Sequence, residues 1–144
     1  MKKTVIGLLT CLLFVTGGTF RVSAAAAAPQ REKIVQTAGR DRLGEFAPLF
    51  AEANDDFLFG KVWNDPSVDL RTRSIITVTA LVSMGVTDSS LKYHLQNAKN
   101  HGVSREEIAG VLTQVGFYAG WPKAWAAFNL AKEVWPDGSA AGSK

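Results

Sequence analysis

The sequence predicts an all-α fold in a single domain of about six helices. Apolar residues recur at helical spacing between about residues 32 and 135, and glycine, proline or capping residues separate these stretches. No strand–turn–strand pattern and no internal repeat is found. Because the connections are short, we expect successive helices to pack as antiparallel hairpins.

The first 24 residues are typical of a secretory signal peptide. Lys2 and Lys3 form a positive start, an apolar stretch follows, and Val22-Ser23-Ala24 is a small-residue cleavage pattern. The apolar stretch is shorter than the roughly 20 residues that a membrane-spanning helix needs. We therefore expect an exported protein, periplasmic or secreted, without membrane attachment once the signal is removed. The expected segments are a signal peptide at 1–24, a flexible stretch at 25–31, the domain at 32–135 and a flexible tail at 136–144.

Removal of this signal changes the composition of the chain. Cys11 is its only cysteine, so the remainder has no disulfide, thiolate nucleophile or cysteine metal ligand. Lipidation of Cys11 is the less favoured alternative, because Thr10 is larger than the residue expected before a lipidated cysteine. The remainder carries 13 basic and 13 acidic residues. The basic character of the whole chain is thus no evidence for a nucleic-acid or anionic-membrane partner.

Two helices are expected before the centre of the chain. Residues Glu32 to Leu43 form a plausible first helix, and Phe46 to Phe59 a second, with Pro48 tolerated in its first turn. A turn region is expected from Gly60 to Asp69.

A central helix is expected from Leu70 to Met84. Asp69 is a suitable N-cap and Gly85 a suitable end. Since the helix is apolar nearly all round, we expect it to be buried.

Three further helices complete the predicted domain. One runs from Ser89 to Asn100 and stops at Gly102, and the next opens with a capping box at Ser104 and closes at Gly120. Pro122 opens the last helix. The apolar surface of these helices exceeds what one small domain easily hides, so we expect a homo-oligomer. The alternative is that loops and the first helix cover it.

The chain has only two histidines, and both lie on the helix expected at 89–100 or at its end. His94 shares its stripe with apolar residues, which leaves two interpretations open: a hydrogen-bonded core histidine or an acid/base group in a pocket. His101 stands beside Gly102, where a cation favours the helix C-terminus, so capping is its preferred interpretation.

Arg71 and Arg73 stand in the first turn of the central helix, where a cation opposes the helix dipole. One explanation is pairing with Asp65 or Asp69. The other is an anion site, where guanidinium and free N–H groups both face a carboxylate.

The remaining polar candidates are weaker. Tyr118 belongs to a tight corner that ends at Gly120 and Pro122, so a structural role is the default and a hydroxyl offered to a pocket is the alternative. Two histidines without cysteine give too few strong ligands for a metal site. We expect no metal and no cofactor.

Together these residues resemble the carboxymuconolactone decarboxylase family. The resemblance covers about Phe46 to Trp135. It rests on FLFGKVW at 57–63, DLRTRS at 69–74, LKYH at 91–94 with Asn97-Ala98, NHGVSREEI at 100–108 and YAGWPKA at 118–124.

The resemblance implies an all-helical fold like that of alkylhydroperoxidase D, in homo-oligomers that are commonly trimers or hexamers. One branch of the family reduces peroxides with a Cys-x-x-Cys pair just before the histidine. Here that pair falls at Thr87 and Ser90, and a glutamate usual in that branch is replaced around Ser74. Thiol peroxidase activity is therefore the least favoured function.

The other branch decarboxylates a carboxylated lactone, which implies an enzyme of the carboxy-lyase type. Its substrate would be a small carboxylated lactone or a related carboxylate. His94 would be the general acid and Arg73 would hold a carboxylate or the developing oxyanion, with Arg71 and Tyr118 as substrate-binding residues. Decarboxylases of this branch act in aromatic-acid catabolism, which is ordinarily cytoplasmic, whereas this chain has an export signal. A non-catalytic ligand-binding or structural oligomer is therefore the alternative.

Overall fold

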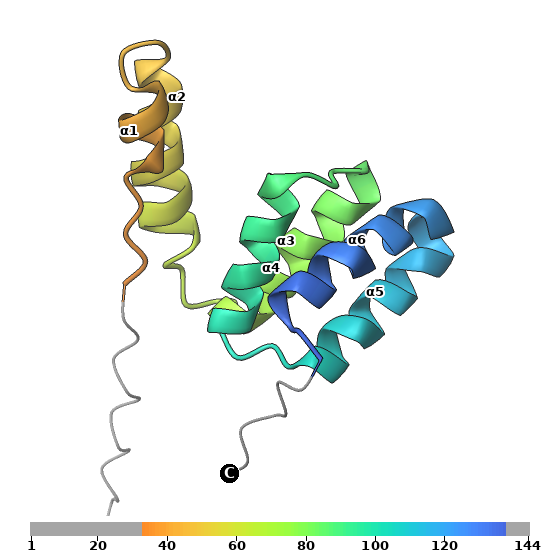
Figure 1. Cartoon of the computed structure of the whole chain (residues 1–144). Coiled ribbons are helices and arrows are strands. Elements are labelled where there is room, and N and C mark those ends of the chain that lie inside the picture. The colour runs from red at the N-terminus through yellow and green to blue at the C-terminus, as the bar shows by residue number, and fades with distance from the viewer. Residues whose placement is uncertain (1–32, 138–144) are drawn as a thin grey trace, which may run out of the picture. The chain divides into compact units, whose positions relative to one another are not determined.

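A computed structural model describes residues 33–137, which contain six helices and no strand (Figure 1). The second of these helices consists of an α-helical part and a π-helical part that carry separate labels. The all-α prediction is therefore confirmed. The expected signal peptide, the stretch 25–31 and residues 138–144 of the tail lie outside the described residues. No helix in the described part is long and apolar enough to cross a membrane. The elements are α1 (Ala38–Leu43), α2 (Pro48–Glu52), the π-helix η1 (Ala53–Val62) that continues α2, α3 (Leu70–Met84), α4 (Ser89–Asn100), α5 (Arg105–Ala119) and α6 (Trp121–Val134).

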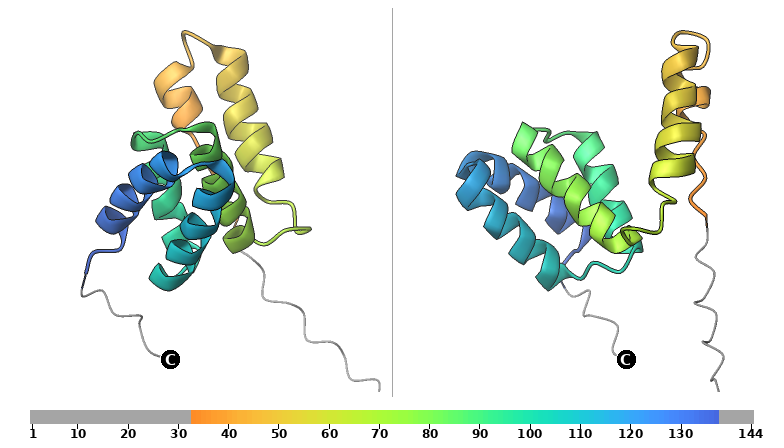
Figure 2. Two further views of the ribbon diagram at one scale, coloured as in Figure 1. Left: turned by 90° about the vertical axis from the view of Figure 1, so that its right-hand side faces the viewer. Right: turned by 180° about the vertical axis from the view of Figure 1, so that it is seen from behind.

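The last four helices enclose the main apolar core (Figures 1 and 2). α3 packs against α4 and α5, α6 packs against the same two helices, and α3 and α6 also touch. Leucines and isoleucines that are fully buried in such a core each contribute about 1.5–3 kcal/mol. The largest fully buried apolar side chains of this core are Val78, Val82, Leu91, Leu95, Ile108 and Leu112.

The boundaries of α3 follow the predicted capping residues. The Asp69 carboxylate accepts a hydrogen bond from the Thr72 N–H at 2.9 Å, and Gly85 ends the helix with a left-handed φ of 85°. We expected this helix to be buried, and in the single chain this is wrong for one of its sides. Ile76 is 56% and Met84 69% exposed, because α4, α5 and α6 cover one stripe of α3 and leave the other side uncovered.

The capping box at the start of α5 is also confirmed. The Ser104 hydroxyl accepts from the Glu107 N–H at 3.2 Å, and the Glu107 carboxylate accepts from the Ser104 N–H at 2.9 Å. These bonds satisfy backbone groups that the first turn leaves unpaired.

The first helix is shorter than expected and the second is longer. α1 begins at Ala38 because the backbone of Ile34 is bound by the Asn64 side chain, with an N–H···O distance of 2.8 Å and an N···O=C distance of 2.9 Å. The helix that contains Pro48 continues through Gly60 as η1, whose wider turn lets the Trp63 N–H donate to the Leu58 carbonyl.

A buried carboxylate joins α1 to η1. Asp55 accepts hydrogen bonds from the N–H groups of Gly39 and Arg40 and from the Asn54 amide, each at 2.9 Å. Burial alone would raise the pKa of Asp55, but these donors outweigh it and hold that pKa below its ordinary value. A Cβ on Gly39 would lie 2.7 Å from the Asp55 carboxylate, so the close approach requires glycine.

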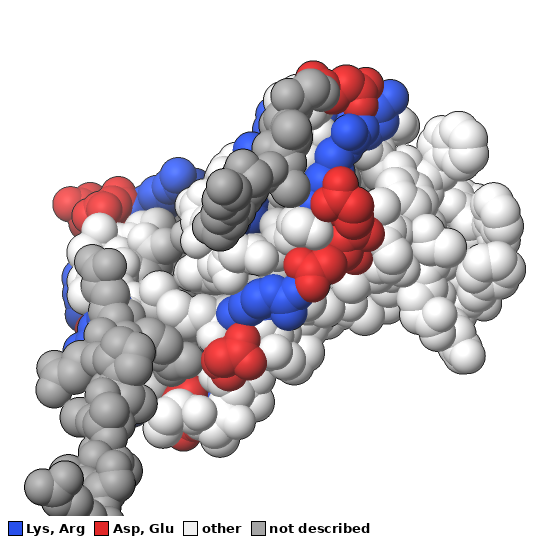
Figure 3. All heavy atoms as spheres, turned by 90° about the horizontal axis from the view of Figure 1, so that it is seen from below, with Lys and Arg blue, Asp and Glu red and all other residues white. Residues whose placement is uncertain are grey.

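Large apolar side chains remain exposed where α5 meets α6. On the face in Figure 3, the surface toward the α5–α6 end of the molecule carries neither acidic nor basic side chains. The exposed aromatic residues of α5 and α6 include Phe117, Tyr118, Trp121 and Trp125.

Candidate functional site

His94 lies on α4 under the indole of Trp63. The two rings stack with centroids 6.5 Å apart and planes at 20°, and the Tyr93 ring meets His94 edge-on at 5.2 Å. Burial lowers the pKa of His94 below its ordinary value, because the charged imidazolium loses solvation there. The neutral ring therefore dominates at pH 7.

Arg73 projects from the first turn of α3 and its side chain is 16% exposed. Its Nη2 donates to the Asp65 backbone carbonyl at 2.9 Å and lies 3.7 Å from the Asp65 carboxylate. Pairing with Asp65 was one of the two explanations that the sequence left open, and the structure shows that pairing. The Nε of Arg73 is buried and has no hydrogen bond within the described part of the chain.

His94 and Arg73 share one property. Within residues 33–137, the buried side-chain polar atoms that lack a hydrogen bond are His94 Nδ1 and Arg73 Nε. Buried polar atoms are nearly always paired, so each such atom is a candidate for contact with a bound molecule. No hydrogen bond or ion pair joins the two side chains to each other in the described part of the chain.

The two other predicted site residues lie elsewhere. Arg71 pairs with Glu107 across α3 and α5, rather than with Asp65 or Asp69. Tyr118 is 84% exposed near the end of α5. Eleven residues of that helix, or about 16 Å of its axis, separate it from Glu107. One chain therefore does not bring Tyr118 to the end of α3 that carries the arginines.

Sequence reasoning missed the contacts of His101. Its backbone N–H caps α4, but its Nδ1 lies 2.8 Å from the Ser74 hydroxyl on α3. Its ring also lies 6.1 Å from that of Trp63, so this one indole touches both histidines. A serine four residues before Val78 and eight before Val82, on the same apolar stripe of α3, was the available signal for such a contact.

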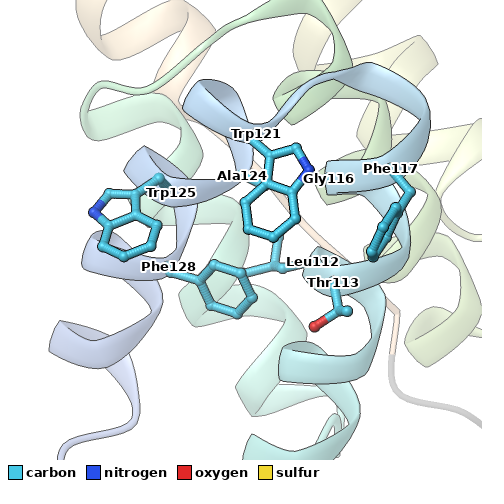
Figure 4. A pocket seen from close by; sticks show the side chains of 8 residues that line it. All are labelled: Leu112, Thr113, Gly116, Phe117, Trp121, Ala124, Trp125 and Phe128. Atoms are coloured by element: carbon cyan, nitrogen blue, oxygen red, sulfur yellow. The ribbon is translucent and has the colours of Figure 1, made fainter.

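A second feature that was not predicted is an apolar pocket of about 160 Å³ between α5 and α6. Figure 4 shows the side chains of Leu112, Phe117, Trp121 and Phe128 around it. Gly116 makes room for this arrangement, since a Cβ there would lie 3.1 Å from the Ala124 methyl group. In the described range, no three acidic, histidine or cysteine residues are placed to hold a metal ion.

Comparison with known proteins decides the family. The profile of the carboxymuconolactone decarboxylase family matches residues 48–133, more than half of the chain. The chain belongs to the carboxymuconolactone decarboxylase family. The match includes both histidines, both arginines of α3 and Tyr118.

Two relatives illustrate the range of this family. The chain is 33% identical over 97 residues to 4-carboxymuconolactone decarboxylase of Acinetobacter baylyi. These residues make up 67% of this chain and 72% of that protein. It is 26% identical over 107 residues to an uncharacterized 15.0 kDa protein of Paracoccus denitrificans, which covers 74% of this chain and 71% of the relative.

Proposed function

We propose that this family member removes CO₂ from a small carboxylated lactone or a related small carboxylate. The observation that carries the proposal is the pair of buried nitrogen atoms without hydrogen bonds, one on His94 and one on Arg73. They belong to side chains of complementary chemistry, a proton carrier and a fixed cation. The 33% identical relative named 4-carboxymuconolactone decarboxylase supports the same class of reaction.

The reaction gives each residue a defined task. The bond between the ring and the carboxylate carbon breaks, CO₂ leaves, and the electron pair moves through the ring double bond onto the lactone carbonyl oxygen. The Arg73 guanidinium holds the substrate carboxylate or stabilises this oxyanion. Protonated His94 then donates a proton to ring carbon, which restores the carbonyl and leaves the imidazole neutral.

Arg71 and Tyr118 are proposed to bind the substrate, each on one condition. Arg71 would exchange its ion pair with Glu107 for a substrate carboxylate. Because Tyr118 lies far along α5 from that pair, it serves a substrate only at a site completed by a second copy of the chain.

Assembly and export are part of the proposal. The exposed aromatic residues of α5 and α6 support a homo-oligomer, as a trimer or hexamer, that covers them. The signal-like first 24 residues support export to the periplasm or the medium. Fractionation of cells that produce the whole chain tests the second point, and full-length protein confined to the cytoplasm would contradict it.

Loss of carboxymuconolactone absorbance on addition of purified protein tests the activity. His94→Ala is expected to lower kcat by about 10²–10⁴-fold, the usual contribution of a general acid. Arg73→Ala is expected to lower it by about 10²–10³-fold.

The chain offers a matched control for each of these variants. Gln96→Ala changes an exposed residue of the same helix as His94, and Arg105→Ala removes an exposed arginine that pairs with Asp137. Both are expected to keep wild-type rates. Binding of the lactone without turnover would instead favour the non-catalytic ligand-binding alternative.

A further inference from the structure

The helical arm formed by α1, α2 and η1 has an inner face that packs within the arm. The buried residues of α2 and η1 recur at intervals of four along the chain: Ala51, Asp55 and Phe59. Asp55 binds the backbone of α1 from this face, through the N–H groups of Gly39 and Arg40. One side of α2 and η1 is thereby occupied by the chain itself.

The opposite side of α2 and η1 is apolar and exposed. Leu49, Ala53 and Phe57 stand two positions away from the buried residues, which places them on roughly the other side of a helix. Leu49 is 81% and Phe57 is 60% exposed. These three residues line a shallow hollow, and we call them the outer face of the arm. A helix that covers only its own core carries polar residues on its outer side, so this outer face indicates a second contact.

The arm does not bring its outer face against the rest of its own chain. Within residues 33–137, α1, α2 and η1 pack on one another, and none of them packs on α3, α4, α5 or α6 (Figures 1 and 2). The arm reaches the other four helices through residues at its ends, such as Trp63 on His94. Among the described residues, the outer face therefore lacks a partner.

The pocket between α5 and α6 is a second apolar surface with exposed walls. Phe117, Trp121 and Trp125 line it (Figure 4), and each is 64–70% exposed. An amphipathic helix that lays its apolar face in such a groove is a common mode of protein recognition. At about 150–250 Å² for each whole side chain, the exposed aromatic residues of arm and groove together offer on the order of 1,000 Å². That is about the area that a specific interface requires.

The charges around the two surfaces are opposite in sign. The segment 45–57, which carries the outer face of the arm, has acidic residues and no basic one. The segment 112–132, which carries the groove, has two lysines and no acidic residue. Two arms or two grooves placed together would oppose like charges, whereas an arm on a groove pairs opposite charges. The charges therefore favour a contact between the two different surfaces.

We propose that the outer face of the arm binds in the α5–α6 groove of a second copy of this chain. Each copy then offers two different surfaces, so the copies assemble either reciprocally in a pair or head-to-tail in a closed ring. The inference rests on the homo-oligomer proposed above and names the segment that covers its exposed aromatic residues. It does not depend on decarboxylation.

Size-exclusion chromatography with light scattering of the whole chain tests the arm's part in assembly. Leu49→Glu is expected to reduce the mass to that of a single chain, because it places a charge in the apolar contact. Gln96→Glu adds the same charge at an exposed position of α4 and is expected to keep the wild-type mass. Leu49→Ser, with the same expected direction, replaces Leu49→Glu if circular dichroism shows unfolding. An unchanged mass in the Leu49 variant would overturn the arm contact alone, whereas a monomeric wild type would overturn the homo-oligomer as well.

Disulfide crosslinking tests which two surfaces meet. In a Cys11→Ser background, an introduced cysteine is the only thiol of the chain. Ala53→Cys of the arm and Thr113→Cys of the groove, produced together and treated with oxidised glutathione, are expected to form a crosslinked pair of chains. Each variant by itself, and Ala53→Cys together with Gln96→Cys, is expected to stay uncrosslinked. No crosslink in the first mixture, or equal crosslinking of either variant with itself, would overturn the proposal.

Discussion

The indole of Trp63 covers the imidazole of His94 in a stacked arrangement, with ring centroids 6.5 Å apart. Trp63, which directly follows η1, is itself only 5% exposed and stacks on Phe59 of that helix. The contact between Trp63 and His94 covers one face of the partly buried histidine that the proposed reaction uses as its proton donor. It thereby couples the position of Trp63, at the C-terminal end of η1, to the chemistry of the candidate site.

The coupling predicts how stability depends on pH. Burial lowers the pKa of His94 in the folded state, so the unfolded chain, with an ordinary value near 6.5, takes up a proton first as the pH falls. The contribution of neutral His94 to the free energy of unfolding is thus complete above about pH 6.5 and is lost as the pH falls toward the folded-state pKa. Urea unfolding from pH 8 to pH 5 measures it. His94→Gln is expected to have the shallower dependence on pH, and equal slopes would contradict this account.

Removal of the indole is expected to raise the pKa of His94 toward 6.5. Trp63→Leu opens the imidazole to water, which restores solvation of its charged form. An NMR titration of the His94 ring protons measures this pKa. Trp125→Leu changes an exposed tryptophan of α6 and serves as the control, with no expected shift. An unchanged pKa in Trp63→Leu would show that other groups bury the ring.

The contact between α1 and η1 predicts opposite effects for two glycine substitutions. Gly39→Ala places a methyl group within 3 Å of the Asp55 carboxylate and the Ala51 carbonyl oxygen, and overpacking of this kind costs about 1–3 kcal/mol. Gly110→Ala meets no neighbour within 4 Å in the middle of α5, so it is expected to stabilise by about 0.5–1 kcal/mol. Urea unfolding compares the two, and the same sign for both would contradict the prediction.

The exposed aromatic residues of α5 and α6 predict an effect on assembly. If a second copy covers them, Trp125→Glu places a charge in that interface and the assembly dissociates toward monomers. Light scattering coupled to size-exclusion chromatography measures the mass. Gln96→Glu adds the same charge on α4 and is expected to leave the mass unchanged. A monomeric wild-type protein would refute the predicted oligomer.

The boundaries of the last four helices were predictable because local chemistry determines them. Asp69 binds an amide three residues away, Ser104 and Glu107 cap each other, and Gly85 and Gly102 take left-handed backbone conformations. Each of these capping interactions involves residues only a few positions apart, so it can be recognised from a single sequence.

Contacts between distant segments were not predictable in this way. The Asn64 side chain binds the backbone of Ile34, 30 residues away, and so shortens the first helix. Ser74 and His101 are 27 residues apart, and their bond was not predicted, although His101 does stand at the predicted C-cap position of α4. Such contacts depend on how the helices pack against each other. The apolar pattern of a sequence shows only which face of each helix is buried. For the same reason, the sequence identified His94 and Arg73 as candidate site residues but could not predict their positions relative to each other.

The pH dependence of kcat/KM for carboxymuconolactone tests the central claim most directly. If protonated His94 donates the proton, kcat/KM of the wild type falls as the pH rises through the pKa of His94, which burial holds below its ordinary value. His94→Ala is expected to be slower by about 10²–10⁴-fold and to lose this dependence. Absence of turnover by the wild type at every pH from 5 to 8, or the same profile in His94→Ala, would contradict the account.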